Sequence, residues 1–338
     1  MNFAVVGDVH IADVAPSTRK DDYKNVVLGK LRYIIDYVND RNKETPGFYA
    51  AILLLGDLFH KKIPFHNSHS MLAQLIKEFE RASCAIFIVP GNHDIHGNMS
   101  TFANQPLNVL VQAGVITLLD GKEPFLFDDG DIKISLNGVP FSPLLDNKGA
   151  ANLYNLSHND SADFKISMFH QMILPNDKKF FNDYINFEDL KDINCDMVLC
   201  GHYHEGYNPP VQSDHGKYFV NGGSITRGTA EQSNFDKSPR FLSLEIKNNG
   251  SVVPTMLVSS IDIPHVPANE VFDFTVIERN KKKKDMHEFM DGLSEMESQS
   301  LSTQEPSGIL NALKVLGLEQ RLEPLVMHYL DEAYAGLT

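Results

Sequence analysis

The sequence predicts an α/β sandwich that is followed by a small C-terminal helical segment. In the first half of the chain, short apolar runs rich in β-branched residues alternate with segments of helical spacing. Strand-like runs dominate the middle of the chain. A protein of 338 residues is long enough to bury a full core between such layers.

The expected strands are short apolar runs, most of which end in a polar cluster. The early and central ones are Phe3–Val6, Ala50–Leu55, Ala85–Val89, Ile132–Leu136, Lys165–Phe169 and Asp196–Leu199. Later strands are expected at Tyr218–Val220, Arg240–Ile246 and Val252–Val258. Asn248-Asn249-Gly250 joins the last two runs and favours a hairpin turn between them.

Helices are expected where apolar residues recur every three or four positions. One stripe runs from Leu28 to Val38, another runs from Leu72 to Phe79, and a short helix is expected at Leu107–Gln112. After about residue 265 a basic run and a polar, Ser-rich segment indicate a linker. Two short helices are expected after the linker, and Pro324 opens the second of them.

The composition indicates a globular protein and no membrane partner. The longest apolar run, Tyr49–Leu55, is too short to cross a bilayer, and no signal peptide is visible. Three cysteines are too few for a disulfide framework, so we expect a cytoplasmic location. The net charge of −14 disfavours a large basic face for nucleic acid, although divalent metals can supply positive charge locally.

Five polar clusters each directly follow an expected strand. They are Gly7-Asp8-Val9-His10, Gly56-Asp57-Leu58-Phe59-His60, Gly91-Asn92-His93-Asp94, His170 and Gly201-His202-Tyr203-His204. Any one of them taken alone is more often a turn or an exposed strand end than a site. Ligands bind beyond the carboxyl ends of the strands in an open α/β sheet, so together these clusters predict one shared crevice.

The residue types in these clusters indicate a metal site. Asp, His and amide donors suit Mn, Fe or Zn ions better than Ca or Cu(I). One carboxylate can bridge two ions about 3.5–4 Å apart, and such a pair activates water and neutralises charge on phosphate. We expect His93 to protonate the leaving oxygen, with Asp94 as its orienting partner. The sequence therefore predicts a metal-dependent phosphoesterase.

In these motifs the sequence resembles the calcineurin-like metallophosphoesterase superfamily, over residues 1 to about 265. The resemblance implies a four-layer αββα sandwich in which helices flank two mixed sheets. It also implies two divalent ions, with Mn²⁺ expected first and Mg²⁺, Fe²⁺ or Zn²⁺ as alternatives. The first ion would be held by Asp8, His10, Asp57 and His204, and Asp57 would bridge to a second ion held by Asn92, His170 and His202.

Within the superfamily, the chain is most similar to the SbcD-type DNA repair exonucleases, in a compact, phage-like form. Gly-Asp-Leu-Phe-His, which ends at His60, resembles their second motif, so His60 joins His93 and Asp94 as a candidate catalytic residue. Residues 137–142 resemble the strand and turn before their capping loop. Residues 221–224 resemble their Pro-Gly-Ser turn, although Gly replaces the Pro. The implied function is a DNA exonuclease or endonuclease subunit of an SbcCD-type repair or recombination complex.

The resemblance also implies domains and partners. We expect a nuclease core at residues 1–265, a reduced capping or linker region at 266–300 and a C-terminal helical pair at 301–338. The pair would bind an SbcC-like ATPase of the SMC family, unless it simply covers the core. The nuclease would form a homodimer through helices near residues 70–81 and 104–113, which requires exposed apolar surface on Met71, Leu107 or Leu110.

Two other functions stay open at this point. A nucleotide phosphodiesterase or protein phosphatase would use the same ligands, and the acidic charge favours it; a narrow, closed pocket would support it. A non-catalytic scaffold is disfavoured because it has no need of the complete ligand set.

Arg227 is expected either to contact phosphate or to form an ion pair. Surface positions are expected for His158, His215, His265, His287 and His328, and exposed or capping ones for His66 and His69, whereas His96 lies close enough in sequence to reach substrate.

Overall fold

The structure is a computed structural model that describes residues 1–279 apart from 148, 180–182, 229–231, 249 and 251–253. Met1–Val271 forms one compact unit, and a second unit begins at Phe272. The C-terminal helical pair predicted at 301–338 lies outside the described residues, as do His287 and His328. The domain boundaries at 265 and 300 stay predictions. None of the described helices is long and apolar enough to cross a membrane.

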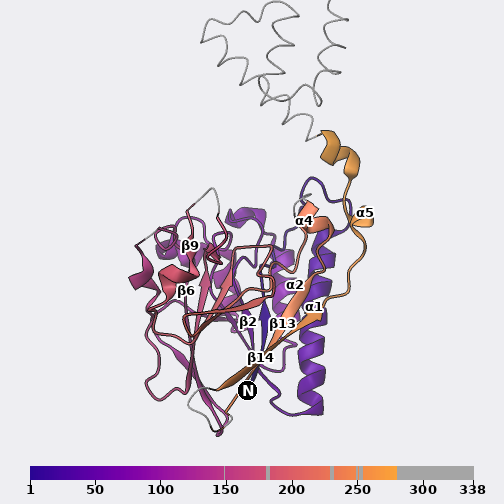
Figure 1. Ribbon diagram of the computed structural model, residues 1–338. Helices are drawn as coiled ribbons and strands as arrows, with labels where there is room; N and C mark the ends of the chain where they lie inside the picture. Colours follow the sequence, from indigo (N-terminus) through magenta and orange to yellow (C-terminus); the bar gives the residue numbers. More distant parts are fainter. Residues whose placement is uncertain (148, 180–182, 229–231, 249, 251–253, 280–338) are drawn as a thin grey trace, which may run out of the picture. The chain divides into compact units, whose positions relative to one another are not determined.

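The first sheet has six strands and carries the long helices on one face (Figure 1). Strands β1, β2, β3 and β4 are parallel to one another, and a helix lies in each connection between them. Strand β13 joins β1 in the antiparallel sense, and β14 pairs with β13 at the edge. The sheet order is β14 (Thr255–Asp262), β13 (Arg240–Lys247), β1 (Asn2–Val6), β2 (Tyr49–Leu54), β3 (Ala85–Ile88) and β4 (Thr117–Leu118); the crossover helices are α1 (Tyr23–Glu44), α2 (His69–Phe79) and α3 (Pro106–Gln112).

The second sheet also has six strands, and its central four are parallel. Its order is β11 (Val211–Asp214), β12 (Lys217–Val220), β10 (Met197–Gly201), β7 (Phe164–His170), β6 (Lys133–Val139) and β5 (Phe125–Asp128). Short elements lie in the connections between these strands: the 3₁₀ helices η3 (Ala151–Tyr154) and η4 (Phe187–Leu190), and the two-stranded sheet of β8 (Ile173–Leu174) and β9 (Ile185–Asn186). Helix α4 (Gln232–Phe235) precedes β13, and α5 (Ala268–Val271) follows β14.

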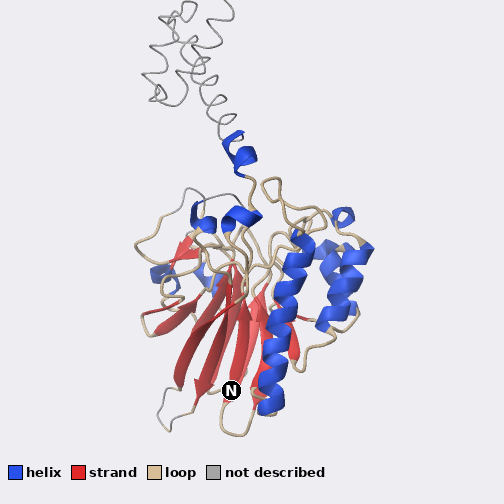
Figure 2. Cartoon of the chain, turned by 90° about the vertical axis from the view of Figure 1, so that its right-hand side faces the viewer, coloured by secondary structure: helices blue, strands red, loops and turns tan. Residues whose placement is uncertain are grey.

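Figure 2 shows the strands with helices packed beside them. These layers follow from the alternation of side chains along the strands. In β1, Ala4 and Val6 pack in the cluster under the helices, whereas Phe3 and Val5 pack between the two sheets. A third cluster, which includes Tyr154 and Phe187 of η3 and η4, covers the outer face of the second sheet. The predicted α/β sandwich with two mixed sheets flanked by helices is confirmed.

Strand β14 is displaced from its predicted range of Val252–Val258. Its pairing with β13 runs from Lys247↔Thr255 to Arg240↔Asp262, so the strand extends through Ser259, Ser260 and Asp262. These polar residues are tolerated because an edge strand of an antiparallel pair can leave one face in water. The predicted hairpin pairing itself is present.

Two expectations about surface residues are wrong. His158 is half-buried, with Nδ1 3.1 Å from Ser135 Oγ and Nε2 3.0 Å from Ser167 Oγ. Its ring therefore ties the loop after η3 to strands β6 and β7.

On α2 and α3, the side chains required for the homodimer face are all buried beneath the helices: Met71, Leu107 and Leu110.

Candidate metal centre

The predicted ligands meet at the carboxyl ends of both sheets. Asp8 and His10 follow β1, Asp57 follows β2, and Asn92 follows β3. From the second sheet, His170 ends β7, while His202 and His204 follow β10. The ladders of these parallel strands set the side chains at one level, because Gly201 pairs with His170 and Val6 pairs with Leu54.

The first ligand group contains Asp8, His10, Asp57 and His204, with one donor atom from each lying within 4.8 Å of the others. His10 Nε2 is 2.9 Å from His204 Nε2 and 3.5 Å from Asp57 Oδ2. His204 Nε2 is 3.5 Å from Asp8 Oδ1. Donors bound to one ion at about 2.1 Å lie about 3–3.5 Å apart, so this spacing suits a single cation.

The second ligand group shares Asp57 with the first. His170 Nε2 lies 3.3 Å from Asp57 Oδ2 and 3.2 Å from His202 Nδ1. Asn92 Oδ1, at 3.2 Å from the same ring nitrogen, adds a neutral oxygen. Since Asp57 Oδ2 belongs to both groups, its carboxylate is placed to bridge two ions.

The pKa shifts of the ligand side chains fit a site that binds cations. Burial raises the pKa of Asp8, but the hydrogen bond and charge of His204 outweigh it and hold this pKa well below its usual range. Burial lowers the pKa of His10 to about 3 and that of His202 to about 4, so both rings are neutral, as metal ligands must be. At His170 burial lowers the pKa, but the charges of Asp57 and Asp8 outweigh it and raise the pKa to about 10.

Two buried atoms of the first group lack a hydrogen-bond partner among the residues that the structure describes: Asp8 Oδ2 and His10 Nδ1. A buried carboxylate oxygen without a donor is costly unless a cation balances it. The donor types, their spacing and this unbalanced oxygen all fit a pair of divalent cations.

The backbone at the site adopts conformations that side chains usually avoid. His10, Asp57 and His202 have φ values of 51°, 47° and 76°, in the left-handed region. Each such residue costs on the order of 1–3 kcal/mol unless its surroundings compensate. Gly91 is required because a Cβ there would lie 2.1 Å from Asp57 Oδ1.

His93 is held at the edge of the first group by main-chain atoms. Its Nδ1 lies 2.7 Å from the carbonyl oxygen of His60, so Nδ1–H donates and Nε2 is left to exchange a proton. The ring of His60 stacks on that of His93 at 5.8 Å between centroids. Burial, followed by the nearby charge of Lys61, lowers the pKa of His60 to about 4.

The expectation that Asp94 orients His93 is wrong. The Asp94 carboxylate accepts from the backbone amides of Phe59 at 3.0 Å and Gly91 at 2.9 Å. It therefore ties the loop after β2 to the loop after β3. Burial and the charge of Asp57 raise the pKa of Asp94 to about 7. The carbonyl oxygen of His60 takes the orienting role.

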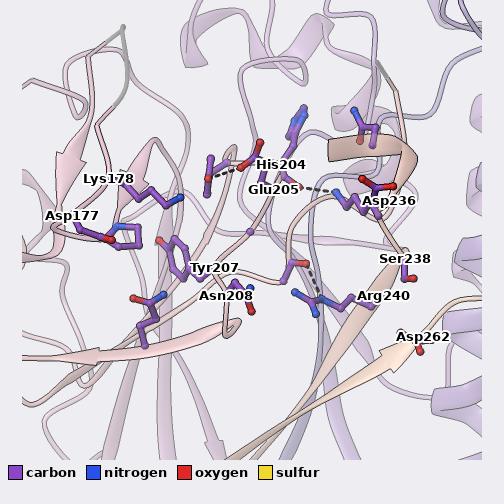
Figure 3. Close-up of a pocket in the computed structure, with 17 residues that line it drawn as sticks. Asp177, Lys178, His204, Glu205, Tyr207, Asn208, Asp236, Ser238, Arg240 and Asp262 are labelled. Carbon is purple, nitrogen blue, oxygen red and sulfur yellow. Dashed lines mark hydrogen bonds between the residues drawn. The ribbon is translucent and has the colours of Figure 1, made fainter. Parts of the chain in front are cut away.

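A cleft of about 840 Å³ adjoins the centre through Tyr203 and His204 (Figure 3). In this view His204 and Glu205 lie between Lys178 on one side and Arg240 on the other. Sequence reasoning missed Lys237 in the cleft wall, whose Nζ donates to the carbonyl oxygen of His204 at 2.6 Å. Nothing in its sequence context distinguishes this lysine from a surface residue.

The other candidate residues lie away from the ligand groups. Arg227 is buried and donates to the carbonyl oxygen of Val266 at 2.6 Å, which is a structural contact. Exposed positions are found for His66, His69, His96, His215 and His265.

A sequence profile of calcineurin-like phosphoesterases matches residues 1–206. The chain belongs to this family. Phosphoesterases of the family use a dinuclear divalent metal site, and the two ligand groups are the candidates for it here. One relative of this phosphoesterase, a probable cyclic nucleotide phosphodiesterase of Coxiella burnetii, is 22% identical over 214 residues, which cover 61% of this chain and 77% of the relative.

Solved structures resemble this phosphoesterase more distantly. A hypothetical protein of Thermus thermophilus is 12% identical with a TM-score of 0.44, over 78% of this chain and 100% of that one. NAD nucleotidase of Haemophilus influenzae is 12% identical with a TM-score of 0.45, over 78% of this chain and 49% of that one.

Proposed function

We propose that this phosphoesterase hydrolyses phosphodiester bonds of DNA, as the nuclease subunit of an SbcCD-type complex. The observation that carries the proposal is the cleft beside the metal centre. Among its lining residues Lys178, Glu205, Asn208, Ser238 and Asp262 are exposed, so the cleft is open to solvent, although Tyr207 and Gly222 in its wall are buried. The volume of about 840 Å³ is within the range of small-ligand sites, so it is the exposure of the cleft that leaves room for a polymer, because a small substrate is usually enclosed.

The residues at the centre have different roles in the proposed hydrolysis. Two divalent cations bound by the ligand groups would neutralise phosphate charge and activate water. His93 Nε2 is free to give a proton to the leaving oxygen, because Nδ1 is engaged by His60. Lys237 holds the main chain of His204 and lies in the cleft wall, where its ammonium can also meet a phosphate oxygen.

The resemblance in the second motif supports DNA as the substrate. His60, which ends that motif, lies against His93 and His10, with ring centroids 5.8 and 5.6 Å away. Its side chain is therefore beside the candidate acid, where it can contact a nucleotide. In the same proposal, an SbcC-like ATPase binds the C-terminal segment 301–338.

A homodimer also belongs to the proposed complex, but the three side chains on α2 and α3 cannot supply its face. Met71, Leu107 and Leu110 are fully buried within the monomer. On α3, Val109 is 44% exposed and Val111 is partly exposed, which leaves little apolar surface on that helix for a partner. A dimer would therefore need a different, more polar face.

A nucleotide phosphodiesterase is the second candidate function. The relative in Coxiella burnetii supports it, since that protein is a probable cyclic nucleotide phosphodiesterase. The net charge of −14 also favours a small substrate over a polyanion, because long-range attraction of DNA is weak. Both functions require the same ligand groups, so the substrate has to be tested directly.

The test incubates the purified full chain with Mn²⁺ and labelled linear, nicked and single-stranded DNA, with a cyclic nucleotide and with bis-p-nitrophenyl phosphate. The proposal expects DNA cleavage that His93→Ala lowers about a hundredfold or more, which controls for contaminating nucleases. Hydrolysis of the cyclic nucleotide without DNA cleavage would instead establish the second candidate. Activity on the simple ester shows in either case that the centre is assembled.

A further inference from the structure

Phe65 projects into solvent close to the candidate metal centre. It lies in the short helix η1 (Pro64–His66), and its 82% exposure exceeds that of every other large apolar side chain in the described residues. It follows His60 by five positions, so its Cα lies within about 18 Å of that residue. A separation up to this limit corresponds to a few nucleotides of a strand whose scissile phosphate is at the centre.

The exposure does not come from a loose loop. Asn67 is buried, and its Nδ2 donates to the carbonyl oxygens of Lys61 at 2.7 Å and Ile63 at 3.3 Å. Ser68 donates to Asp13 through both its amide, at 2.8 Å, and its hydroxyl, at 2.9 Å. The loop is thus held at both ends, and an aromatic ring on a rigid loop loses little entropy on binding.

Two lysines precede the ring by three and four positions. Lys61 and Lys62 are exposed, and within the described part of the chain neither side chain has an ion pair or hydrogen bond. These are two free cations in a protein of net charge −14. An aromatic ring on the same short loop as two lysines combines base stacking with neutralisation of phosphate, as in surfaces that bind single strands.

We propose that Lys61, Lys62 and Phe65 form a binding rim for an unpaired nucleic-acid strand that enters the metal centre. Phe65 stacks on a base, and the two lysines contact phosphates. The inference rests on the proposed function, because it assigns the strand a path at that same site.

A second copy of the chain is a poorer occupant of this rim. A stable interface buries about 800 Å² on each partner. Within residues 1–100 the other exposed large apolar side chain is Val14, which is 72% exposed beside Asp13, while Leu72 and Leu75 of α2 are buried. The apolar area is therefore too small for a dimer, whereas one ring suffices to stack on one base.

The rim is tested by fluorescence anisotropy of a labelled single strand with hydrolysis-resistant phosphorothioate linkages, on the full chain with Mn²⁺. We expect Phe65→Ala to weaken binding about 5- to 150-fold, the usual effect of losing one stacked base. Phe65→Trp should retain binding. Lys61→Gln and Lys62→Gln should each lower the slope of log affinity against log salt by about 0.7.

The matched control is Leu257→Ala, which removes another exposed apolar side chain. Leu257 is 59% exposed and lies on β14, the edge strand of the first sheet, three strands away from β2. It should leave binding unchanged. Equal affinity of Phe65→Ala and the unsubstituted protein would overturn the rim, even if DNA is cleaved. A lower oligomeric mass of Phe65→Ala would overturn it in favour of an interface between copies. Binding that depends on Phe65 without any DNA cleavage would leave the rim standing and refute the proposed nuclease function.

Discussion

At the scale of single residues, Asp57 links every part of the candidate centre. Its Oδ2 approaches both His10 and His170, and its Oδ1 accepts from the backbone amide of His93 at 2.8 Å. The carboxylate therefore connects both ligand groups to the loop of the candidate acid. Neighbouring Gly91 leaves just enough room for it.

We predict that Asp57→Ala abolishes ester hydrolysis and lowers metal occupancy at both positions, because each ligand group loses its shared oxygen. Metal content by mass spectrometry and turnover of bis-p-nitrophenyl phosphate are the measurements. Asp40→Asn, on the exposed face of α1, is the matched control and should keep both. Two fully occupied ions in Asp57→Ala would show that Asp57 does not bridge.

His93 should give a different result, since it exchanges a proton and holds no ion in this scheme. His93→Ala should retain metal but lose about two to four orders of magnitude in kcat. The loss should be smaller for esters whose leaving group needs no proton, which a series of substituted phenyl esters measures. A loss that is the same across the series would assign His93 to binding.

At the scale of elements, His158 fastens the loop after η3 onto β6 and β7. Burial, together with the charge of Lys165, lowers its pKa to about 4 from 6.5. The unfolded chain therefore takes up a proton at higher pH than the folded protein. Stability from this group is complete above pH 6.5 and is lost as the pH falls from 6.5 to about 4.

We predict that His158→Gln lowers the free energy of unfolding near pH 7 by roughly 1 kcal/mol, since one of two hydrogen bonds is lost. Between pH 7 and pH 5 the variant should lose less stability than the unsubstituted protein. Urea unfolding at both pH values measures this difference. His66→Gln, at an exposed position, should follow the unsubstituted protein; parallel pH profiles for all three would contradict the assignment.

The strands were predictable because most of them are buried on both faces and read as continuous apolar runs. The ligands were predictable because metal affinity depends on side-chain type, and strand ends bring such residues together. The hydrogen-bond partner of His93 could not be predicted, because it is the main-chain carbonyl of His60, which residue types do not reveal. The exposure of Phe65 was equally hidden, because an apolar residue between helices is normally assigned to the core.

At the scale of the whole molecule, the nuclease proposal depends on the segment beyond the core. Residues 301–338 carry two apolar helical stripes in the sequence, and each predicted helix is too short to be stable alone. They therefore need a surface to pack on, which is either the core or a partner. The compact unit Met1–Val271 contains both candidate ligand groups and both six-stranded sheets without them.

We predict that deletion of residues 303–338 preserves hydrolysis of the simple ester and the melting temperature, but abolishes binding to an SbcC-like ATPase. Calorimetry and pull-down with the ATPase are the measurements. A fall in melting temperature of many degrees, with loss of ester hydrolysis, would mean that the segment completes the core and would remove the support for the partner.

The ligands come from both sheets, and contact between His10 and His204 closes a stretch of 194 residues. A bound ion would act on this chain as a reversible cross-link that staples one sheet to the other. Such a staple favours the folded state by mass action, by about 2.7 kcal/mol at a hundredfold excess of metal over its dissociation constant. Chelation should therefore lower the melting temperature, and restored Mn²⁺ should raise it again. The concentration of available metal would then control the stability of the folded protein as well as its catalytic rate.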